Sequence, residues 1–469
     1  EVKAELAVLA REQRCTWEVN VWALVLARCP ELFAVYTASH NPTILTGYGC
    51  GSRCTNKIPL QDNPSSKRMQ ELCCLYINLD ESVERRQHIE QELGMLPTLT
   101  RVSATRHANG AYGLAQTLLR VLDMVEAQDK ELICIFEDDF QWEIPRDEIE
   151  SRLLALMQQS FDLVLLSYHL PVVQLSQLAP PLARISNGQT TCGFMFRRNF
   201  TPHLRRVFEQ SVAGLLEGPS DTFAVDQTWK ALQVLEHGTF AAIPRLGKQR
   251  AGFSTIEHQD VEYGGGCFVI ILSCHAYAER RQQQDLGQMP FSYRYFVGQT
   301  EEPAGPLPAD VVQLECGDYY EDLPIKTFRA LQWVRQHYPH IDYVLKTDDD
   351  IVFDFERLYA LYTSVCRQRL DYSGNVSLLE AYHTDTTYHY GKCHNKSKEV
   401  PFALTVRPMH YCSGGGYFLS RRAVTACLDS VEVYRSHLLE DMATGQALLA
   451  HGIHATATDI HTGGACQWS

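Results

Sequence analysis

The sequence predicts two α/β domains in tandem, each with a mostly parallel sheet that helices cover on both faces. Two observations lead to this fold class. Short apolar runs, typical of buried strands, alternate with segments of helical periodicity. The same succession of motifs also occurs twice, at a separation close to half of the 469 residues, which indicates two copies of one domain. We expect the copies over residues 71–260 and 261–469, after a stem or accessory segment over residues 1–70.

The repeat consists of an apolar strand, a Glu-Arg-Arg sequence, an acidic triplet, a glycine-containing strand, an aspartate that opens a helical run, and a late histidine. Because each copy has its own acidic triplet, each is expected to have its own site. The paired segments are residues 74–79 and 267–272, 84–86 and 279–281, 137–139 and 348–350, and 191–198 and 413–422; the paired single residues are Asp226 and Asp441, and His258 and His461.

In the first copy, apolar runs predict three buried strands, over residues 73–79, 131–136 and 161–167. One amphipathic segment predicts a helix between residues 111 and 128, because its leucines recur at the spacing of one helix face. Strands that alternate with helices favour parallel pairing, since parallel strands need a long crossover connection.

The second copy repeats this plan. Its acidic triplet again follows an apolar strand, and a glycine-rich strand again precedes the last long helix. The expected strands cover residues 267–273, 292–298, 341–346 and 411–419, and the expected helices cover about 325–338 and the segment from 441 onward.

The composition narrows the classes of partner. A formal net charge of −14 argues against nucleic acid, whose phosphates need a basic surface. No run of about 20 apolar residues occurs, so no segment is expected to span a membrane. The chain begins at Glu1 rather than at Met, and we expect that an N-terminal anchor or signal has been removed.

The cysteines and the glycosylation sequons point to the lumen of the secretory pathway. A total of 16 cysteines and the Asn-x-Ser/Thr sequons at Asn199, Asn375 and Asn395 favour an oxidising, glycosylating compartment. Cys134 lies within an apolar strand and is expected to be a buried free thiol. Cys50 and Cys54 have no second pair at zinc spacing nearby, which favours a disulfide.

The acidic triplets are the candidate chemical centres. They follow equivalent strands, at the carboxyl ends where open α/β sheets bind ligands. Alternate residues of an extended segment point the same way, so the first and third acids of each triplet are expected to converge on one divalent cation. Carboxylate oxygens favour Mn²⁺ or Mg²⁺, with substrate phosphates completing the shell, whereas the alternative is a solvated acidic turn. The triplets are Glu137, Asp138 and Asp139, and Asp348, Asp349 and Asp350.

Further site residues follow each triplet. His258 and His461 lie at similar distances after their triplets and are candidate metal ligands, or else polar surface residues. Asp226 and Asp441 begin helical runs, so each is either a first-turn carboxylate or a general base.

Arginines follow the first strand of each copy. Arg85 and Arg280 either meet the phosphates of a nucleotide or lie on a solvated helix face. The glycines Gly193 and Gly414 to Gly416 indicate a close approach of the backbone to a sugar or to a neighbouring strand.

The motifs of the second copy resemble glycosyltransferase family 31, the β1,3-galactosyl/N-acetylglucosaminyltransferase and Fringe group. The similarity covers about residues 267–469. It rests on Lys346-Thr-Asp-Asp-Asp-Ile-Val-Phe, Gly414-Gly-Gly-Tyr-Phe-Leu-Ser, Glu440-Asp-Met-Ala-Thr-Gly and His461. The resemblance implies a GT-A fold, Mn²⁺ bound through Asp350 and His461, and Asp441 as the base.

The first copy resembles glycosyltransferase family 25, the lipooligosaccharide and collagen galactosyltransferase group. The similarity covers about residues 72–259 and rests on Tyr76-Ile-Asn-Leu-Asp, Glu84-Arg-Arg, Phe136-Glu-Asp-Asp and Phe253-Ser-Thr-Ile. Together the two resemblances imply tandem GT-A, Rossmann-like domains.

We therefore expect a bifunctional, Mn²⁺-dependent, inverting glycosyltransferase of the Golgi lumen. Each site would transfer a hexose, galactose from UDP-galactose, to a glycan or glycoprotein, and the two sites would act in sequence. The alternative keeps only the C-terminal domain catalytic and makes the N-terminal domain an acceptor-binding module. A metal-dependent hydrolase or phosphotransferase is disfavoured, because the sequence has no G-x4-G-K-S/T loop.

Overall fold

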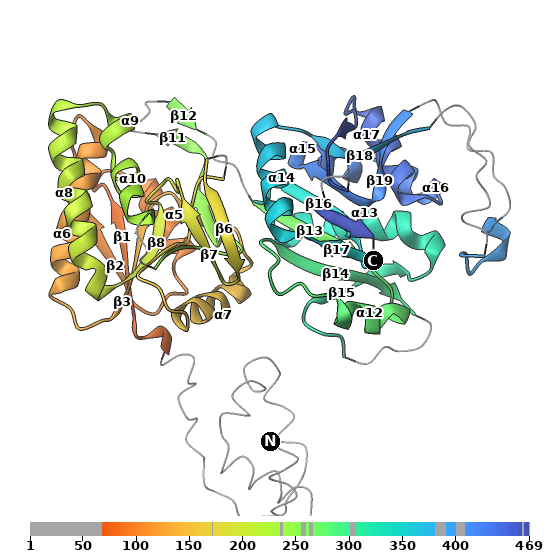
Figure 1. Cartoon of the computed structure of the whole chain (residues 1–469), viewed down its shortest axis with the longest axis horizontal. Helices are drawn as coiled ribbons and strands as arrows, with labels where there is room; N and C mark the ends of the chain where they lie inside the picture. The colour runs from red at the N-terminus through yellow and green to blue at the C-terminus, as the bar shows by residue number, and fades with distance from the viewer. Residues whose placement is uncertain are drawn as a thin grey trace, which may run out of the picture. The chain divides into compact units, whose positions relative to one another are not determined.

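The computed structural model divides the chain by its contacts into two units, Glu1–Glu71 and Leu72–Ser469. Residues 1–67 lie outside the described residues, so the predicted stem over residues 1–70 and the predicted Cys50–Cys54 disulfide stay predictions. The second unit contains two large sheets (Figure 1). The described residues are 68–170, 172–234, 238–254, 259–261, 266–300, 306–379, 391–399, 409–461 and 464–468.

The N-terminal sheet is mixed rather than mostly parallel, which corrects the prediction for this copy. Its strands are β1 (Leu72–Asn78), β2 (Leu99–Ser103), β3 (Leu132–Glu137), β5 (Leu163–Leu165), β6 (Gln174–Ala179), β7 (Leu182–Ser186), β8 (Gly193–Arg197) and β9 (Thr239–Ala242), in the order β2-β1-β3-β8-β5-β9-β7-β6. Among the described residues three pairings are parallel and four antiparallel. Antiparallel neighbours can be joined without a helical crossover, so the alternation of strands and helices did not require parallel pairing throughout.

Helices cover this sheet, and α6 and α8 lie side by side along it (Figure 1). The predicted helix is confirmed as α6, where Asn109 accepts a hydrogen bond from the Tyr112 backbone N–H at 3.3 Å and so caps the first turn. Its Leu118, Leu122 and Val125 are fully buried, and each such side chain contributes about 2 kcal/mol. The helices are α5 (Val83–Glu92), α6 (Gly110–Glu126), α7 (Arg146–Met157), α8 (Thr201–Glu217), α9 (Ser220–Phe223), α10 (Val225–Thr228) and α11 (Lys230–Gln233).

The C-terminal sheet confirms the prediction of mostly parallel pairing. Its strands are β13 (Cys267–Leu272), β14 (Ser292–Gln299), β15 (Val311–Gly317), β16 (Tyr343–Asp348), β18 (Tyr372–Leu379), β19 (Met409–Ser420) and β20 (Thr456–Ala457), in the order β15-β14-β13-β16-β19-β18-β20. In the described part, four pairings are parallel and two antiparallel. The helices are α12 (Ala278–Gln283), α13 (Leu323–His337), α14 (Phe355–Gln368), α15 (Arg421–Leu428), α16 (Val431–Ser436) and α17 (Glu440–Ala450).

The centres of the two sheets have the same plan. The order β2-β1-β3-β8 corresponds to β14-β13-β16-β19, with the same parallel, parallel and antiparallel pairings. After the acidic triplet, each half forms a short antiparallel ribbon, β4 (Phe140–Trp142) with β10 (Gly247–Gln249) and β17 (Ile351–Phe353) with β21 (Cys466–Trp468). The duplication read from the motifs is therefore also present in the topology.

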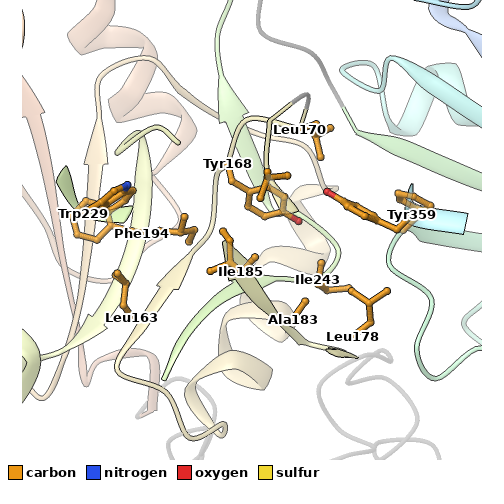
Figure 2. Close-up of a cluster of buried hydrophobic side chains, with 14 of the residues drawn as sticks. Leu163, Tyr168, Leu170, Leu178, Ala183, Ile185, Phe194, Trp229, Ile243 and Tyr359 are labelled. Carbon is orange, nitrogen blue, oxygen red and sulfur yellow. The ribbon is translucent and has the colours of Figure 1, made fainter. Parts of the chain in front are cut away.

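Apolar packing and a hydrogen bond to a buried carboxylate join the two halves within the second unit. Figure 2 shows Tyr168, in the N-terminal half, and Tyr359, on α14, with their hydroxyl ends pointing toward one another. The buried Glu143 carboxylate accepts hydrogen bonds from Arg245 Nε at 2.6 Å and Nη2 at 2.8 Å, and from the Gly266 backbone N–H at 2.7 Å. Because Gly266 directly precedes β13, this pair fixes the start of the second sheet.

Most of the described cysteines, nine of twelve, are buried in this fold. All twelve described cysteines are free thiols, and Cys134 is fully buried, as predicted. The disulfides expected from the cysteine count are therefore absent from the described residues, where cysteines on strands and helices pack as apolar side chains. Within the same residues, no helix is both long and apolar enough to cross a membrane.

Loss of the buried ion pair is expected to destabilise the second unit strongly. Arg245→Ala leaves the Glu143 carboxylate buried without its guanidinium, so the free energy of unfolding should fall by about 3–5 kcal/mol. The measurement is a urea titration followed by circular dichroism. The matched control is Arg435→Ala, which breaks an exposed pair with Glu432 and should cost less than about 1 kcal/mol. Equal losses in the two variants would contradict the structural role of Arg245.

Candidate active site

The acidic triplets follow the interior strands β3 and β16, as predicted, but the chain turns within each triplet. Glu137 and Asp348 end their strands, and the two acids that follow each of them lie in a turn. The backbone is no longer extended there, so the expected convergence of first and third acids does not follow from strand alternation. In the part of the chain that the structure describes, no group of three His, Cys, Asp or Glu side chains is arranged to hold a metal.

The middle acid of each triplet holds its turn against the first strand. Asp138 accepts hydrogen bonds from Asn78 Nδ2 at 2.8 Å and from Arg85 Nε at 2.7 Å. Asp349 accepts equivalent bonds from Ser273 Oγ at 2.6 Å and from Arg280 Nη1 at 3.0 Å. The two arginines predicted to meet a nucleotide therefore contact the acidic turns of their own halves.

A buried lysine organises the C-terminal turn. Lys346 Nζ donates to Asp348 Oδ1 at 2.9 Å and to the Gly414 carbonyl at 2.8 Å, and it forms an ion pair with Glu440. Lys346 and Asp348 share one face of β16 because they are two residues apart on a strand. Burial opposes the charged ammonium, but the two carboxylates outweigh it and raise the pKa of Lys346.

Glu440 is the second buried charge of this cluster. It opens α17 and accepts a hydrogen bond from Tyr417 Oη at 2.9 Å. Burial raises the pKa of Glu440 to about 7, although the Lys346 ammonium opposes the shift. A Cβ at position 414 would lie only 2.8 Å from Glu440 Oε1, so Gly414 leaves room for the carboxylate. The predicted close approach to the backbone at these glycines is thus made at Gly414 by a side chain of the same half.

Asp441 adjoins the same cluster. It lies in the first turn of α17, and its carboxylate accepts a hydrogen bond from its neighbour, the Met442 backbone N–H, at 2.8 Å. Burial raises the pKa of Asp441, and the nearby Lys346 ammonium works against this shift. A carboxylate with a raised pKa is a better proton acceptor, which is the property required of a general base.

Asp350 and His461 fit a divalent cation in their chemistry. Asp350 Oδ1 is buried without a hydrogen-bond partner, and burial followed by the charges of Asp348 and Asp349 raises its pKa. His461 Nδ1 donates to the Cys466 carbonyl at 2.8 Å, which leaves Nε2 as the basic nitrogen. β21 pairs with β17, directly after Asp350, so the chain brings the histidine turn to the side of the acidic turn.

The N-terminal counterparts are arranged differently. Glu137 accepts a hydrogen bond from Thr191 Oγ1 at 2.6 Å, and burial with the Asp139 charge raises its pKa to about 8. Asp226, on α10, has a pKa raised by burial, and its Oδ2 accepts a long hydrogen bond from the Thr190 backbone N–H at 3.4 Å. His258 lies outside the described residues, so its metal role stays a prediction.

A cavity of 760 Å³ adjoins the N-terminal triplet. It extends from the end of β1 to the start of α6, and its wall over residues 104–110 was not singled out from the sequence. The only sequence signal there is Asn109-Gly110, a helix cap. The lining residues are Ile77, Asn78, Leu79, Glu81, Ser82, Arg85, Ala104, Thr105, Arg106, His107, Ala108, Gly110, Leu114, Glu137 and Asp138.

Sequence reasoning also missed the roles of Lys346 and Glu440. Both occur in motifs that drew attention for their neighbours, Asp348 and Asp441. The available signal was the lysine itself, since a charged residue at a buried strand position needs a buried partner.

The matches to known proteins lie in the C-terminal half. Residues 301–459 match the family described as Galactosyltransferase. This stretch contains Lys346, the acidic turn and Asp441, and it ends before His461. The C-terminal half therefore carries a galactosyltransferase-like domain, which confirms that part of the predicted resemblance. The resemblance predicted for residues 72–259 stays a prediction.

Curated relatives support the same assignment. UDP-GalNAc:beta-1,3-N-acetylgalactosaminyltransferase 1 is 29% identical over 157 residues in Sus scrofa, which is 33% of this chain and 44% of that protein. The Homo sapiens protein of that name is 30% identical over 144 residues, 30% of this chain and 41% of its own. Beta-1,3-galactosyltransferase 5 of Pan troglodytes is 27% identical over 139 residues, 30% of this chain and 45% of that protein. The chain thus spans less than half the length of these relatives.

One solved structure aligns over more of its own length. It is a glycosyltransferase involved in the glycosylation of the major capsid of PBCV-1, and it covers 40% of this chain and 96% of that chain at 10% identity. The TM-score of 0.27 is too low to establish a common fold.

The free energy of unfolding is expected to depend on pH through Glu440. Its pKa is about 7 in the folded protein against 4.5 in ordinary surroundings, so the folded state retains a proton that the unfolded chain has released. This stabilisation is complete below about pH 4.5 and is lost as the pH rises through about 7, by about 3 kcal/mol at 1.4 kcal/mol per pKa unit.

Glu440→Gln should remove that part of the pH dependence. The measurement is a series of urea titrations between about pH 4 and 8 on both proteins, with the difference between them taken at each pH. If the two proteins lose stability in parallel over this range, the Glu440 carboxyl does not titrate as described.

Proposed function

We propose that the C-terminal half transfers a hexose from a UDP-sugar, with galactose from UDP-galactose as the first choice, to a hydroxyl of a glycan or glycoprotein. The observation that carries the proposal is the cluster of Lys346, Asp348, Glu440 and Asp441 around Gly414, beside the unpartnered oxygen of Asp350. This cluster lies within the stretch that is similar to galactosyltransferases. The names of the matched relatives, which state transfer of N-acetylgalactosamine or galactose, support a hexose donor.

Asp441 is proposed as the general base. The acceptor hydroxyl gives its proton to the carboxylate while its oxygen forms the bond to the anomeric carbon. The bond from that carbon to the diphosphate breaks on the opposite face, so the configuration inverts, as in single-displacement glycoside chemistry. Asp348 is proposed to face the donor, and Asp349 and Arg280 to hold the turn against which the diphosphate binds.

Asp350 and His461 are proposed to hold Mn²⁺, with Mg²⁺ as the alternative. The support is chemical: a carboxylate oxygen without a partner and an imidazole whose Nε2 is the basic nitrogen. A divalent cation bound there would neutralise charge on the departing diphosphate. In this proposal Lys346, Asp348 and Asp349 hold the turn in shape and do not coordinate the metal ion.

The N-terminal half is proposed as a second transferase site that acts in sequence with the first, through Asp226 as base and the turn of Glu137, Asp138 and Asp139. Its support is the shared sheet plan and the adjoining cavity. The alternative is a non-catalytic module that binds the acceptor glycan, which the same cavity also favours.

Asparagine replacements of the two proposed bases test both parts. Asp441→Asn should lower transfer from UDP-galactose by about 10²–10⁴-fold, because the carboxylate no longer accepts the proton, while UDP-galactose binding persists. The measurement screens UDP-sugars with Mn²⁺ and identifies each product by mass. Asp226→Asn is the matched variant, and it should remove a second product.

Three outcomes count against the proposal. Intact transfer in Asp226→Asn makes the N-terminal half a binding module. Intact transfer in Asp441→Asn removes the base from the C-terminal site. If the wild-type chain neither binds nor turns over any nucleotide sugar, the transferase assignment fails.

A lumenal, glycosylating compartment, the Golgi, is proposed for the protein. The three sequon asparagines, Asn199, Asn375 and Asn395, are all exposed on the folded protein, so attached glycans meet no steric conflict there. Expression in a secreting eukaryotic cell should give a protein whose electrophoretic mobility increases after peptide-N-glycosidase treatment. Replacing all three asparagines with glutamine should abolish the shift, and an unshifted wild-type protein would contradict the compartment.

A further inference from the structure

The two acidic turns differ in what neutralises them. In the N-terminal half, Arg85 Nη2 lies 2.5 Å from Asp138 Oδ1 and 3.0 Å from Asp139 Oδ2, so one guanidinium bridges two carboxylates. In the C-terminal half, Arg280 contacts Asp349 at 3.0 Å but lies 3.9 Å from Asp350. The third acid is thus paired at close range in one half and not in the other.

The remaining oxygen of the third acid shows the same contrast. Cys192 Sγ donates to Asp139 Oδ1 at 3.4 Å, and Gln249 Nε2 approaches Oδ2 at 3.5 Å. Asp350 Oδ1 is buried and has no such donor. The sheet register explains the difference, because Gly193 pairs with Phe136 and Gly416 pairs with Thr347. The residue equivalent to Cys192 is therefore a glycine, Gly415, which has no side chain to donate.

A divalent cation suits only one of these two turns. Two neighbouring carboxylates both stay ionised when a cation lies between them. A guanidinium can be this cation, just as a metal ion can. Adding Mn²⁺ to Asp139 would place it beside the Arg85 guanidinium or displace it, and either change loses charge-assisted hydrogen bonds in a largely enclosed site. The N-terminal residues therefore do not fit the metal that the sequence predicted for Asp139.

The cavity beside the N-terminal turn gives the guanidinium a second use. Arg85 lines the 760 Å³ cavity together with Arg106, His107 and Ser82, and so does Gly110, the first residue of α6. The contacts with Asp138 and Asp139 use the Nε and Nη2 groups of Arg85, so the two N–H donors of Nη1 remain for a ligand. Arginine, imidazole, hydroxyl and helix N-terminal N–H groups are the donors that bind phosphate.

We propose that the N-terminal half binds a nucleoside diphosphate without a divalent cation, with the Arg85 guanidinium in the cation's place, and that of the two acidic turns the C-terminal one is metal-dependent. This inference rests on the proposed function in taking a nucleotide sugar as the ligand. The two sites then differ in the cation that neutralises the diphosphate, a guanidinium in the N-terminal half and a metal ion in the C-terminal half.

Binding of UDP in the presence of EDTA tests the first part by isothermal titration calorimetry. One UDP should bind per chain, and Arg85→Gln should weaken this binding at least about tenfold, the loss of one charge-assisted phosphate contact. The matched control is Arg86→Gln, since Arg86 pairs with Glu90 on the surface of α5 and does not line the cavity. Ala108→Trp, at an exposed position of the cavity wall, should also block UDP without altering the acidic turn.

Binding of Mn²⁺ alone, followed by electron paramagnetic resonance, tests the second part. One ion should bind per chain, Asp350→Asn should abolish this binding, and Asp139→Asn should retain it. Two bound ions, loss of the ion in Asp139→Asn, or UDP binding that vanishes in EDTA would each overturn the inference. Failure of the proposed function has another signature, namely no UDP-sugar bound or turned over in the presence of Mn²⁺.

Discussion

Repulsion between neighbouring carboxylates at the end of a strand is the constraint on which both sites depend. Two unit charges 4 Å apart interact by about 4 kcal/mol at an effective dielectric constant of about 20, so a triplet of acids needs cations nearby. The protein supplies two of them from distant parts of the sequence, Arg85 from the helix after β1 and Arg280 from the helix after β13. The third, Lys346, comes from the acid-bearing strand itself. The first strand, the following helix and the acidic turn are thereby held as one assembly in each half.

The C-terminal half extends this logic across its sheet. Lys346 is shared between Asp348 at the strand end and Glu440 at the start of α17, and Tyr417 on the neighbouring strand completes the contacts of Glu440. Asp441 owes its position to this network, because the helix that carries it is tied to β16 through its first residue. The carboxylate of Asp441, the proposed base, is thus held beside the acidic turn of Asp348 to Asp350 without forming a short ion pair, so it stays available to meet a substrate.

Much of this arrangement could be predicted from the sequence, for reasons of local physics. Apolar runs identified the strands that carry the triplets, and helical periodicity identified α6, because burial leaves a regular pattern in the residues themselves. The antiparallel pairing of β8 with β3 and of β19 with β16 could not be predicted from the sequence. Strand pairing joins residues far apart in the chain, and the hydrophobic pattern of one strand does not specify its partner or direction. In the N-terminal half, the antiparallel pairings of β8 with β3 and β5 and of β7 with β6 and β9 make the sheet mixed.

Which charged side chains contact one another could not be predicted from the local sequence either. Arg85 was predicted to meet a nucleotide and Asp139 to bind a metal ion, and the contact between these two side chains was not foreseen. Only the fold decides which charges meet. The twelve free cysteines of the described residues follow the same rule: their number pointed to disulfides, but nine of them are buried as free thiols.

The hydrogen bond from Gly266 to Glu143 has a practical consequence for dissecting the chain. Glu143 belongs to the first half and Gly266 opens the second, and Glu148 in the first half likewise accepts a hydrogen bond from Tyr338 Oη in the second at 3.0 Å. A cut between the halves would strip a buried carboxylate of one of its donors and expose the aromatic face around Tyr168 and Tyr359. Because these contacts cross the boundary, the two proposed sites are best separated by single substitutions in the intact chain.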